Sequence, residues 1–288
     1  RVMLVLIGDQ GIGKGLFLRI LQHIWRGSTL ITSLSNRVVG QFNASLDGKL
    51  IIILDEALFE GDRKSQDSIK SLITEPVISI EQKHQPSRQV SSFHRFVATT
   101  NHQKFTQLEK TDRRYCFFGV SSKYRGDGDY FDQLAKCIED DAELGGLVDH
   151  LMSVDLSGFR PDVAIHSKLR DTQMLSSLQG FDAFWFQCLL SAFDQCRGDW
   201  PGKKLDWDEL TGGFISSALL LSSYESWSRA IRTYRKVNYQ DIKLSIEEYV
   251  GNVSCRTTER GYKMPSLKVL RNKFETALGL HEGVEWGD

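Results

Sequence analysis

The sequence predicts an α/β protein in which a parallel sheet is covered by helices on both faces. Short, unbroken apolar runs are typical of strands buried on both faces, and helical or loop segments separate them here. The first run is followed by a glycine-rich loop and then by apolar residues at helical spacing. The expected strands are VMLVLI (2–7), STLITS (28–33), LIIIL (50–54), RFVATTN (95–101) and YCFFGV (115–120).

Composition is that of an ordinary globular protein, with 288 residues, of which 41% are hydrophobic and 25% charged. The formal net charge is −1, so any binding to nucleic acid must come from local patches. The five cysteines show no CxxC pair and no metal-ligand spacing, which favours free thiols in a reducing compartment. Neither a membrane span nor a signal peptide is apparent, and we expect a cytoplasmic location without membrane partners.

The organisation of the chain predicts a large core followed by smaller parts. Because the chain starts at Arg1, without Met, and enters an apolar run at once, we expect it to be a piece of a longer polypeptide. We divide it into an ATPase core at 1–165, a helical connector at 166–203 and a small helix-rich C-terminal domain at 204–288. The stretch RGDWPGKK (197–204) is the best linker candidate.

The loop GDQGIGK (8–14) fills the frame G-x-x-x-x-G-K. Glycines let successive backbone N–H groups point at phosphates, and the following helix start adds a positive dipole end. Lys14 is expected to reach the β- and γ-phosphates of ATP, and the flanking strand and helix argue against a mere glycine turn. The expected nucleotide-contacting residues are Gly8, Asp9, Gln10, Gly11, Ile12, Gly13, Lys14, Gly15 and Leu16.

Gly15 departs from this frame, because a Ser or Thr hydroxyl that binds Mg²⁺ directly is usual at that position. Taken alone, Gly15 argues against a working site. The residues described next reverse that judgement, and we expect water or Asp55 to complete the magnesium shell.

Two polar strand ends supply the expected catalytic groups. Asp55 and Glu56 follow the run LIIIL, and we expect Asp55 to hold Mg²⁺ and Glu56 to polarise the attacking water. Asn101 ends a further apolar run, and its amide can orient that water or sense the γ-phosphate. Either motif alone could be an ordinary strand end. Together with the loop they predict one site, because the carboxyl ends of parallel strands meet at one edge.

Arg113 and Arg114 come just before the last expected strand. In ring ATPases an arginine from one subunit stabilises transition-state charge in its neighbour. We expect one of the pair to act in this way, although a local ion pair with Asp112 is an alternative reading.

These four elements, in this order and at this spacing, resemble the superfamily 3 helicases, which are hexameric AAA+ motors. The resemblance implies a hairpin within SQDSIKSLITEPVISIEQKHQPSRQVSSF (65–93), with a basic tip that follows single-stranded DNA in a central channel. By position, Lys83 and His84 are the tip residues and Arg88 is a weaker candidate. Glu75 departs from the family, which often has glycine before the hairpin.

The stretch from 124 to 168 is similar to the region after the motor core in phage primase–helicases of the poxvirus-like branch. That resemblance implies a replicative DNA helicase that uses ATP and Mg²⁺ in the host cytoplasm. It also implies a homo-oligomeric ring, expected to be a hexamer, at a replication fork, with a primase–polymerase module upstream in the same chain. The tail resembles the helical or winged-helix C-terminal domain of such proteins.

Two other functions remain open at this point. A small-molecule kinase would share the phosphate loop, but it would not need a sensor Asn followed by paired arginines. A nucleotide-dependent DNA-binding, origin-recognition or loader ATPase would have the same motor site, so that only DNA-stimulated activity and the hairpin's function separate it from a helicase.

Overall fold

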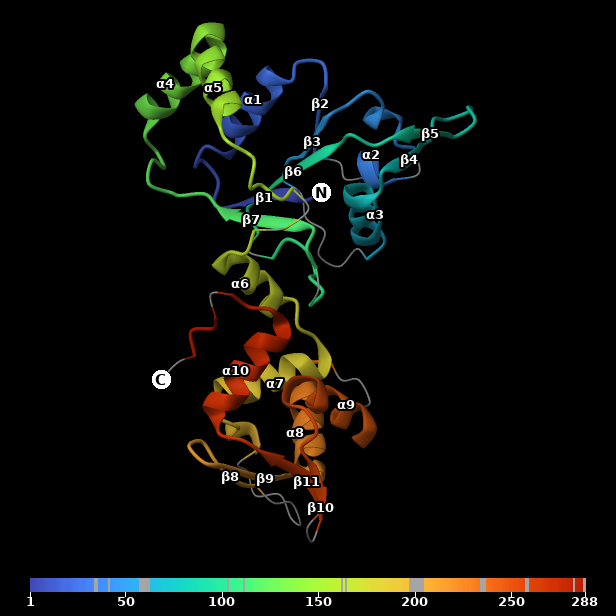
Figure 1. Ribbon diagram of the computed structural model, residues 1–288, viewed down its shortest axis with the longest axis vertical. Helices are drawn as coiled ribbons and strands as arrows, with labels where there is room; N and C mark the ends of the chain where they lie inside the picture. Colours follow the sequence, from blue (N-terminus) through green and yellow to red (C-terminus); the bar gives the residue numbers. More distant parts are fainter. Residues whose placement is uncertain are drawn as a thin grey trace. The chain divides into compact units, whose positions relative to one another are not determined.

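The computed structural model divides the chain into two compact units (Figure 1). The first holds Arg1–Leu108 and Asp112–Gln173, and the second holds Glu109–Thr111 and Met174–Asp288. The structure describes residues 1–33, 36–40, 42–56, 63–102, 104–110, 112–161, 163, 165–196, 205–233, 237–256, 259–281 and 283–286. The predicted linker at 197–204 lies outside the described residues.

The first unit is built on a five-stranded sheet in which every pairing is parallel, in the order β2-β3-β6-β1-β7. All five strands predicted from the sequence are confirmed. Their bounds are β1 Met3–Ile7, β2 Thr29–Thr32, β3 Ile51–Leu54, β6 Arg95–Thr100 and β7 Tyr115–Gly119. Because β6 lies between β1 and β3, the carboxyl ends of these three strands are adjacent at one edge of the sheet.

The sheet is buried on both faces, as its apolar strands require. On one face Leu18 of α1 (Lys14–Ile24) packs with Ile51, Ile53 and Val97. On the other, Phe105 meets the rings of Tyr115 and Phe117 edge to face, a favourable geometry for aromatic pairs. Because both faces of the sheet are packed, the strand ends at its carboxyl edge are held in fixed positions.

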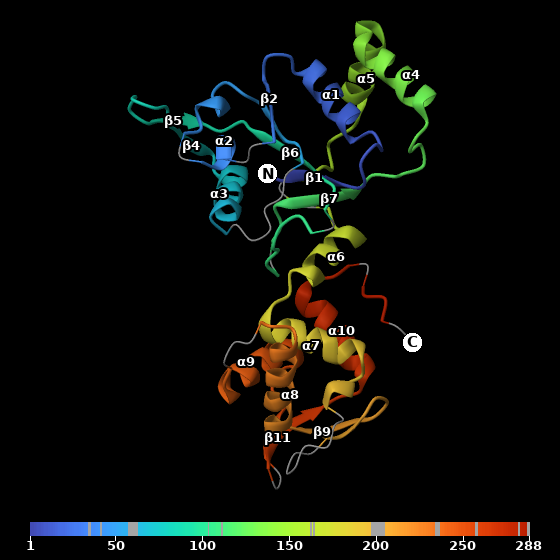
Figure 2. The same cartoon turned by 180° about the vertical axis from the view of Figure 1, so that it is seen from behind.

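The stretch from Tyr130 to Leu151, whose sequence pattern is helical, falls in two helices, α4 (Gly128–Glu139) and α5 (Asp141–Ser153). Asp140 separates them, because its extended backbone ends α4 while its carboxylate caps α5 through the N–H groups of Ala142 and Glu143. Figure 2 shows α4 and α5 beside α1, and contacts join α1 to both helices.

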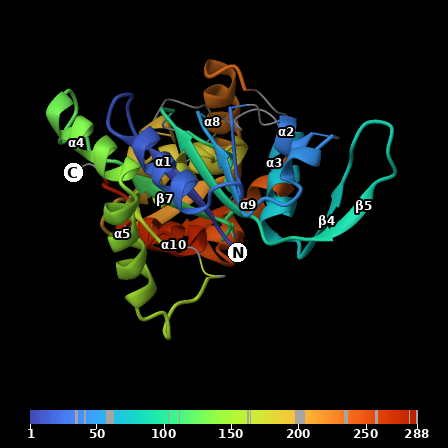
Figure 3. The same ribbon diagram turned by 90° about the horizontal axis from the view of Figure 1, so that it is seen from above.

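A two-stranded antiparallel hairpin, β4 (Val77–Ile80) and β5 (Arg88–Ser91), follows α3 (Arg63–Thr74). It extends away from the five-stranded sheet in the view of Figure 3. The hairpin expected within residues 65–93 is confirmed, and Phe93 lies beyond β5 with 65% of it exposed. The other short elements of this unit are α2 (Asn36–Val39) and η1 (Ala44–Leu46), and α6 (Lys168–Ser176) begins in this unit and ends in the second.

The second unit combines helices with a four-stranded antiparallel sheet of order β10-β11-β9-β8. Its elements are α7 (Gly180–Leu190), η2 (Asp194–Cys196), β8 (Leu205–Asp208), β9 (Gly212–Ser216), α8 (Ser217–Ala230), α9 (Tyr239–Val250), β10 (Ser254–Arg256), β11 (Arg260–Met264) and α10 (Leu267–Leu278). Leu267, Leu270, Phe274 and Leu278, which recur at helical spacing in the sequence, are buried in α10. Ser266 stands at its N-cap, but its side chain makes no capping hydrogen bond.

Candidate nucleotide site

The glycine loop connects the buried end of β1 to the first turn of α1. Gly11 and Gly13 have φ angles of 73° and 95°, which favour glycine because a Cβ clashes with the backbone in the left-handed region. Gly13 is also the N-cap of α1, so the unpaired N–H groups of that helix start directly after it. The loop therefore has the backbone form that an anion site requires.

The remaining glycines of the loop differ in what restricts them. A Cβ at Gly8 would lie 2.5 Å from Ile12 Cδ1 and 3.2 Å from the carbonyl oxygen of Val120. One at Gly15 would meet nothing within 4 Å, and the φ of Gly15 is not positive. Close packing thus disfavours a side chain at position 8, whereas neither packing nor backbone conformation requires glycine at position 15.

Lys14 is held across the loop by three short hydrogen bonds. Its Nζ donates to the carbonyl oxygens of Gly8 and Asp9, both at 2.6 Å, and to Oδ1 of Asn101 at 2.7 Å. Partial burial lowers the pKa of Lys14 below its ordinary value, and the charges of Asp55, Asp9 and Glu56 oppose that shift. The ammonium group thus connects the loop after β1 to the end of β6.

Thr99 organises the acidic pair. Its Oγ1 donates to Oδ1 of Asp55 over 2.5 Å and accepts a hydrogen bond from the backbone N–H of Glu56 at 3.1 Å. Glu56 has a φ of 54°, unusual for a residue with a Cβ. One buried hydroxyl from β6 therefore fixes both the carboxylate of Asp55 and the backbone of Glu56.

These groups surround a cavity of about 400 Å³ at the carboxyl edge of the sheet. Its lining combines loop residues, the two carboxylates, the end of β6 and one ring from α4. The lining residues are Gln10, Gly11, Gly13, Lys14, Gly15, Leu16, Asp55, Glu56, Thr99, Asn101 and Phe131. The structure thus brings Lys14, Asp55, Glu56 and Asn101 together, as the sequence predicts.

Three predicted loop residues do not line the cavity. Gly8 and Asp9 contribute backbone oxygens to Lys14, and Ile12 is buried. The Asp9 carboxylate forms an ion pair with Arg125 at 2.9 Å, which ties the loop to the segment that connects β7 to α4. We therefore interpret these three residues as supports of the loop.

The donor set fits Mg²⁺ bound together with a phosphate ligand. Mg²⁺ usually keeps several waters and takes one or two carboxylates plus phosphate oxygens, and Asp55 and Glu56 are two carboxylates on the cavity wall. No group of three or more His, Cys, Asp or Glu side chains suited to a metal occurs among the described residues. A site of this kind needs the phosphate to supply part of the shell.

The predicted DNA-contacting residues lie on the hairpin, apart from the cavity lining. Lys83 and His84 are exposed at the turn between β4 and β5, and His84 has a φ of 63°. Lys83 Nζ lies 5.6 Å from the centre of the Phe42 ring, a cation–π distance. Arg88 forms an ion pair with Asp47, so its charge is partly neutralised within the unit.

Arg113 and Arg114 precede β7 and thus lie at the edge of the sheet opposite the cavity. The N–H of Met3, at the start of β1, donates to the carbonyl oxygen of Arg114, whereas the cavity begins after the end of β1. The five residues of β1, at 3.3 Å each, separate the two edges by roughly 17 Å. Arg114 is half-buried with its guanidinium 3.7 Å from Asp112, and Arg113 is exposed.

Two lining residues were not predicted from the sequence, Thr99 and Phe131. Thr99 could have been found, because a hydroxyl at the end of an apolar strand beside an acidic strand end is a polar group in need of a partner. Phe131 has no comparable signal, since its place over Gly13 depends on how α4 packs.

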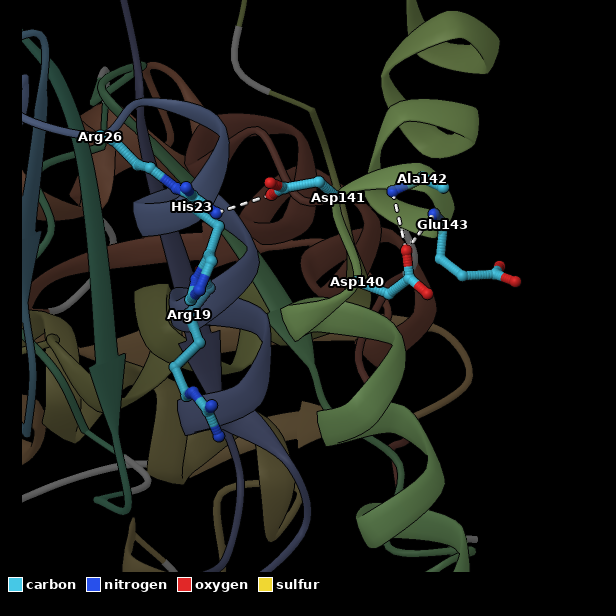
Figure 4. A network of polar contacts seen from close by, with 7 residues as sticks. All are labelled: Arg19, His23, Arg26, Asp140, Asp141, Ala142 and Glu143. Atoms are coloured by element: carbon cyan, nitrogen blue, oxygen red, sulfur yellow. Dashed lines mark hydrogen bonds and ion pairs between the residues drawn. The ribbon is translucent and has the colours of Figure 1, made fainter.

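Figure 4 shows an ion pair that joins α1 to α5, one of the two helices that follow the sheet. Arg26 forms an ion pair with Asp141 of α5 at 2.8 Å, and Arg19 forms one with Glu139 of α4 at 2.6 Å. Each exposed pair contributes about 0–1 kcal/mol. Together with the helix contacts they hold α4 beside the phosphate loop.

Fold and site thus define an α/β protein with a five-stranded parallel sheet and a glycine-rich loop between β1 and α1. Residues 6–114 match a family of unknown function, DUF5906. The DNA primase-polymerase of Nitratiruptor phage NrS-1 is 29% identical over 115 residues, which are 38% of this chain and 16% of that protein.

Two solved structures of the C-terminal region of NrS-1 have a similar fold. One superposes with a TM-score of 0.64 at 19% identity and covers 91% of this chain and 67% of that one. The other has a TM-score of 0.62 at 20% identity and covers 92% of this chain and 66% of that one. At these identities the likeness establishes the fold. Among the described residues, no helix is long and apolar enough to cross a bilayer.

Proposed function

We propose that this chain is the ATP-hydrolysing motor of a phage or mobile-element DNA helicase of the superfamily 3 type. The observation that carries the proposal is the convergence of Lys14, Asp55, Glu56 and Asn101 on one cavity. Groups for phosphate binding, for magnesium binding and for activation of water are the ones that ATP hydrolysis requires together.

In the proposed reaction the phosphates of ATP bind to the loop and to Lys14. Lys14 then exchanges hydrogen bonds with Gly8, Asp9 or Asn101 for bonds to phosphate oxygens. Asp55 would hold Mg²⁺, which neutralises phosphate charge when it is bound. Glu56 takes a proton from the attacking water, and Asn101 orients that water or contacts the γ-phosphate.

A neighbouring chain supplies the remaining positive charge. The separation of Arg113 and Arg114 from the cavity of their own chain supports action on the next subunit, because neither can reach its own site. We therefore propose a homo-oligomeric ring, expected to be a hexamer, in which each site receives an arginine from its neighbour.

Single-stranded DNA is the proposed track, contacted by Lys83 and His84 at the hairpin tip. Their exposure on a projecting hairpin supports this role (Figure 3), since repeated cations around a ring would attract the phosphate backbone. The similarity to a phage DNA primase-polymerase supports a place in replication and a primase–polymerase module in the same polypeptide.

The decisive experiment measures ATP hydrolysis with and without single-stranded DNA. We expect wild type to be stimulated by DNA, and Glu56→Gln to lose about 10²- to 10⁴-fold, the usual contribution of a general base. Glu143→Gln, which changes an exposed carboxylate on α5, is the matched control and should behave like wild type.

The other outcomes separate the alternative functions. Hydrolysis without DNA stimulation or strand separation would favour an origin-binding or loader ATPase. Transfer of phosphate to a small-molecule acceptor would favour a kinase. If Glu56→Gln hydrolyses ATP at the wild-type rate, the assignment of the acidic pair is wrong.

A further inference from the structure

We propose that Phe131 is the residue on which the base of the nucleotide stacks, an inference that rests on the proposed ATP site. The argument starts from the order of the strands. The acidic pair follows β3 and Asn101 follows β6, so the groups for the γ-phosphate all lie on the β3 side of the phosphate loop. A nucleotide with its γ-phosphate there must extend its nucleoside end toward the opposite side.

That opposite side is formed by the segment that leaves β7. The N–H of Val120 donates to the carbonyl oxygen of Ile7, and Arg125 forms an ion pair with Asp9, so this segment runs directly beside the loop. It leads into α4, which delivers Phe131 to the cavity wall. The nucleoside end is thereby directed toward α4.

Phe131 is the only aromatic side chain among the described residues that line the cavity. A Cβ on Gly13 would lie 2.9 Å from its Cε1, so the edge of the ring rests on the loop itself. Tyr130 packs against Phe131 with an interplanar angle of 75°, and stacks in turn on Tyr124 with ring centroids 3.9 Å apart. The ring is therefore supported by its neighbours and presented at the nucleoside end of the cavity.

Stacking on an aromatic ring recognises the π-face that every base has, so it favours nucleotides over base-free polyphosphates. The structure therefore assigns a base subsite to α4, separate from the phosphate subsite on the loop. Substitution of Phe131 should weaken the binding of a nucleotide and leave the binding of a linear triphosphate unchanged.

The experiment compares the equilibrium binding of Mg²⁺–ATP and of Mg²⁺–tripolyphosphate to the 288-residue chain by calorimetry. Phe131→Leu keeps an apolar side chain of similar volume but removes the ring, and should weaken ATP binding about 5- to 30-fold. Tripolyphosphate affinity should stay within about 2-fold, because its contacts are on the loop. Phe131→Trp, which keeps an aromatic ring, should bind ATP more tightly than Phe131→Leu does. Phe159→Leu, which replaces a 56% exposed ring, is the matched control and should bind both ligands like wild type.

Each failure has its own pattern. If Phe131→Leu weakens both ligands equally, Phe131 only supports the loop, and if it weakens neither, the base lies elsewhere; both results would overturn the base subsite. If wild type binds neither ligand, or if Lys14→Ala binds both normally, the proposed ATP site itself is wrong.

Discussion

At the scale of single residues, the loop separates positions that need glycine from one that does not. Gly11 and Gly13 have positive φ angles, and a Cβ at Gly8 would press on Ile12. Position 15 has neither constraint. Glycine at position 15 is therefore not a requirement of the loop's shape, and in the proposed site it means that a hydroxyl able to bind Mg²⁺ is missing.

This difference gives opposite expectations for two substitutions. Gly15→Ser should leave ATP hydrolysis within a few-fold of wild type, at an equal or lower Mg²⁺ requirement, because the added hydroxyl has room and can bind the ion. Gly13→Ala should remove most activity, since a Cβ at this φ costs about 1–2 kcal/mol and meets Phe131. Steady-state hydrolysis in a Mg²⁺ titration measures both.

Lys14→Ala is the reference for both substitutions and should abolish hydrolysis. A normal rate in Lys14→Ala would mean that the loop is only a turn. A severe loss in Gly15→Ser, with its fold intact by circular dichroism, would contradict the steric freedom inferred for position 15.

The candidate site could be predicted from sequence where a polar residue of suitable chemistry stands in a recognisable motif. Lys14, Asp55, Glu56 and Asn101 each follow an apolar run, and parallel strands bring their ends together. Phe131 could not be predicted, because a Phe on an amphipathic helix is usually core. Only the packing of α4 against α1 reveals that it borders the loop.

At the scale of elements, the hairpin β4–β5 extends the first unit in one direction. Ile78 and Ile80 are buried along β4, whereas Lys83 and His84 are exposed in the turn at the tip. This division permits a change at the tip without loss of the apolar contacts that hold the hairpin.

Lys83→Ala should therefore leave hydrolysis in the absence of DNA unchanged and weaken binding to single-stranded DNA. The logarithm of the affinity falls with the logarithm of salt concentration by about 0.7 for each phosphate contact. In Lys83→Ala the slope of log affinity against log salt should therefore become shallower by about 0.7 for each Lys83 that contacts a phosphate. Fluorescence anisotropy with a labelled oligonucleotide over a salt series measures the change.

Lys136→Ala removes an equivalent exposed charge on α4 and is the matched control. If Lys83→Ala binds and unwinds DNA like wild type, the hairpin tip is not the DNA contact.

The elements of the first unit were easier to predict than those of the second. The five parallel strands are short apolar runs with clear ends, which only a strand buried on both faces explains well. In the second unit β9 begins with two glycines and β11 contains one, so neither shows the alternation of a half-buried strand. The break between α4 and α5 at Asp140 cannot be predicted from the sequence for a related reason, since an acidic residue on an exposed helix face gives the same signal as a cap.

At the scale of the whole molecule, the exposed Arg113 is the better of the two candidates for action on a neighbour, because Arg114 is already paired with Asp112. Neither Lys14→Ala nor Arg113→Ala should hydrolyse ATP well alone, since loss of such an arginine costs about 10³- to 10⁵-fold. An equal mixture should recover about a quarter of the wild-type rate. In random assembly, half the sites keep Lys14 and half of those receive an intact arginine.

Hydrolysis by the two variants, alone and mixed, at concentrations where the chains associate, measures this recovery. The control is Lys14→Ala alone, at twice its concentration in the mixture, so that the total protein concentration is the same. No recovery in a mixture whose chains demonstrably co-assemble would contradict action between subunits.

The separation of Arg113 from the cavity of its own chain has a consequence for the symmetry of the proposed assembly. A chain that receives an arginine at one edge of its sheet and donates one at the other has two unlike contact surfaces, which face in different directions. In a two-fold dimer the same patch of both chains forms the one interface, so each chain could receive an arginine only if that patch contained both surfaces. Assembly of such chains is directional, and it ends only when the last chain meets the first; an arrangement that fails to close would grow as a filament.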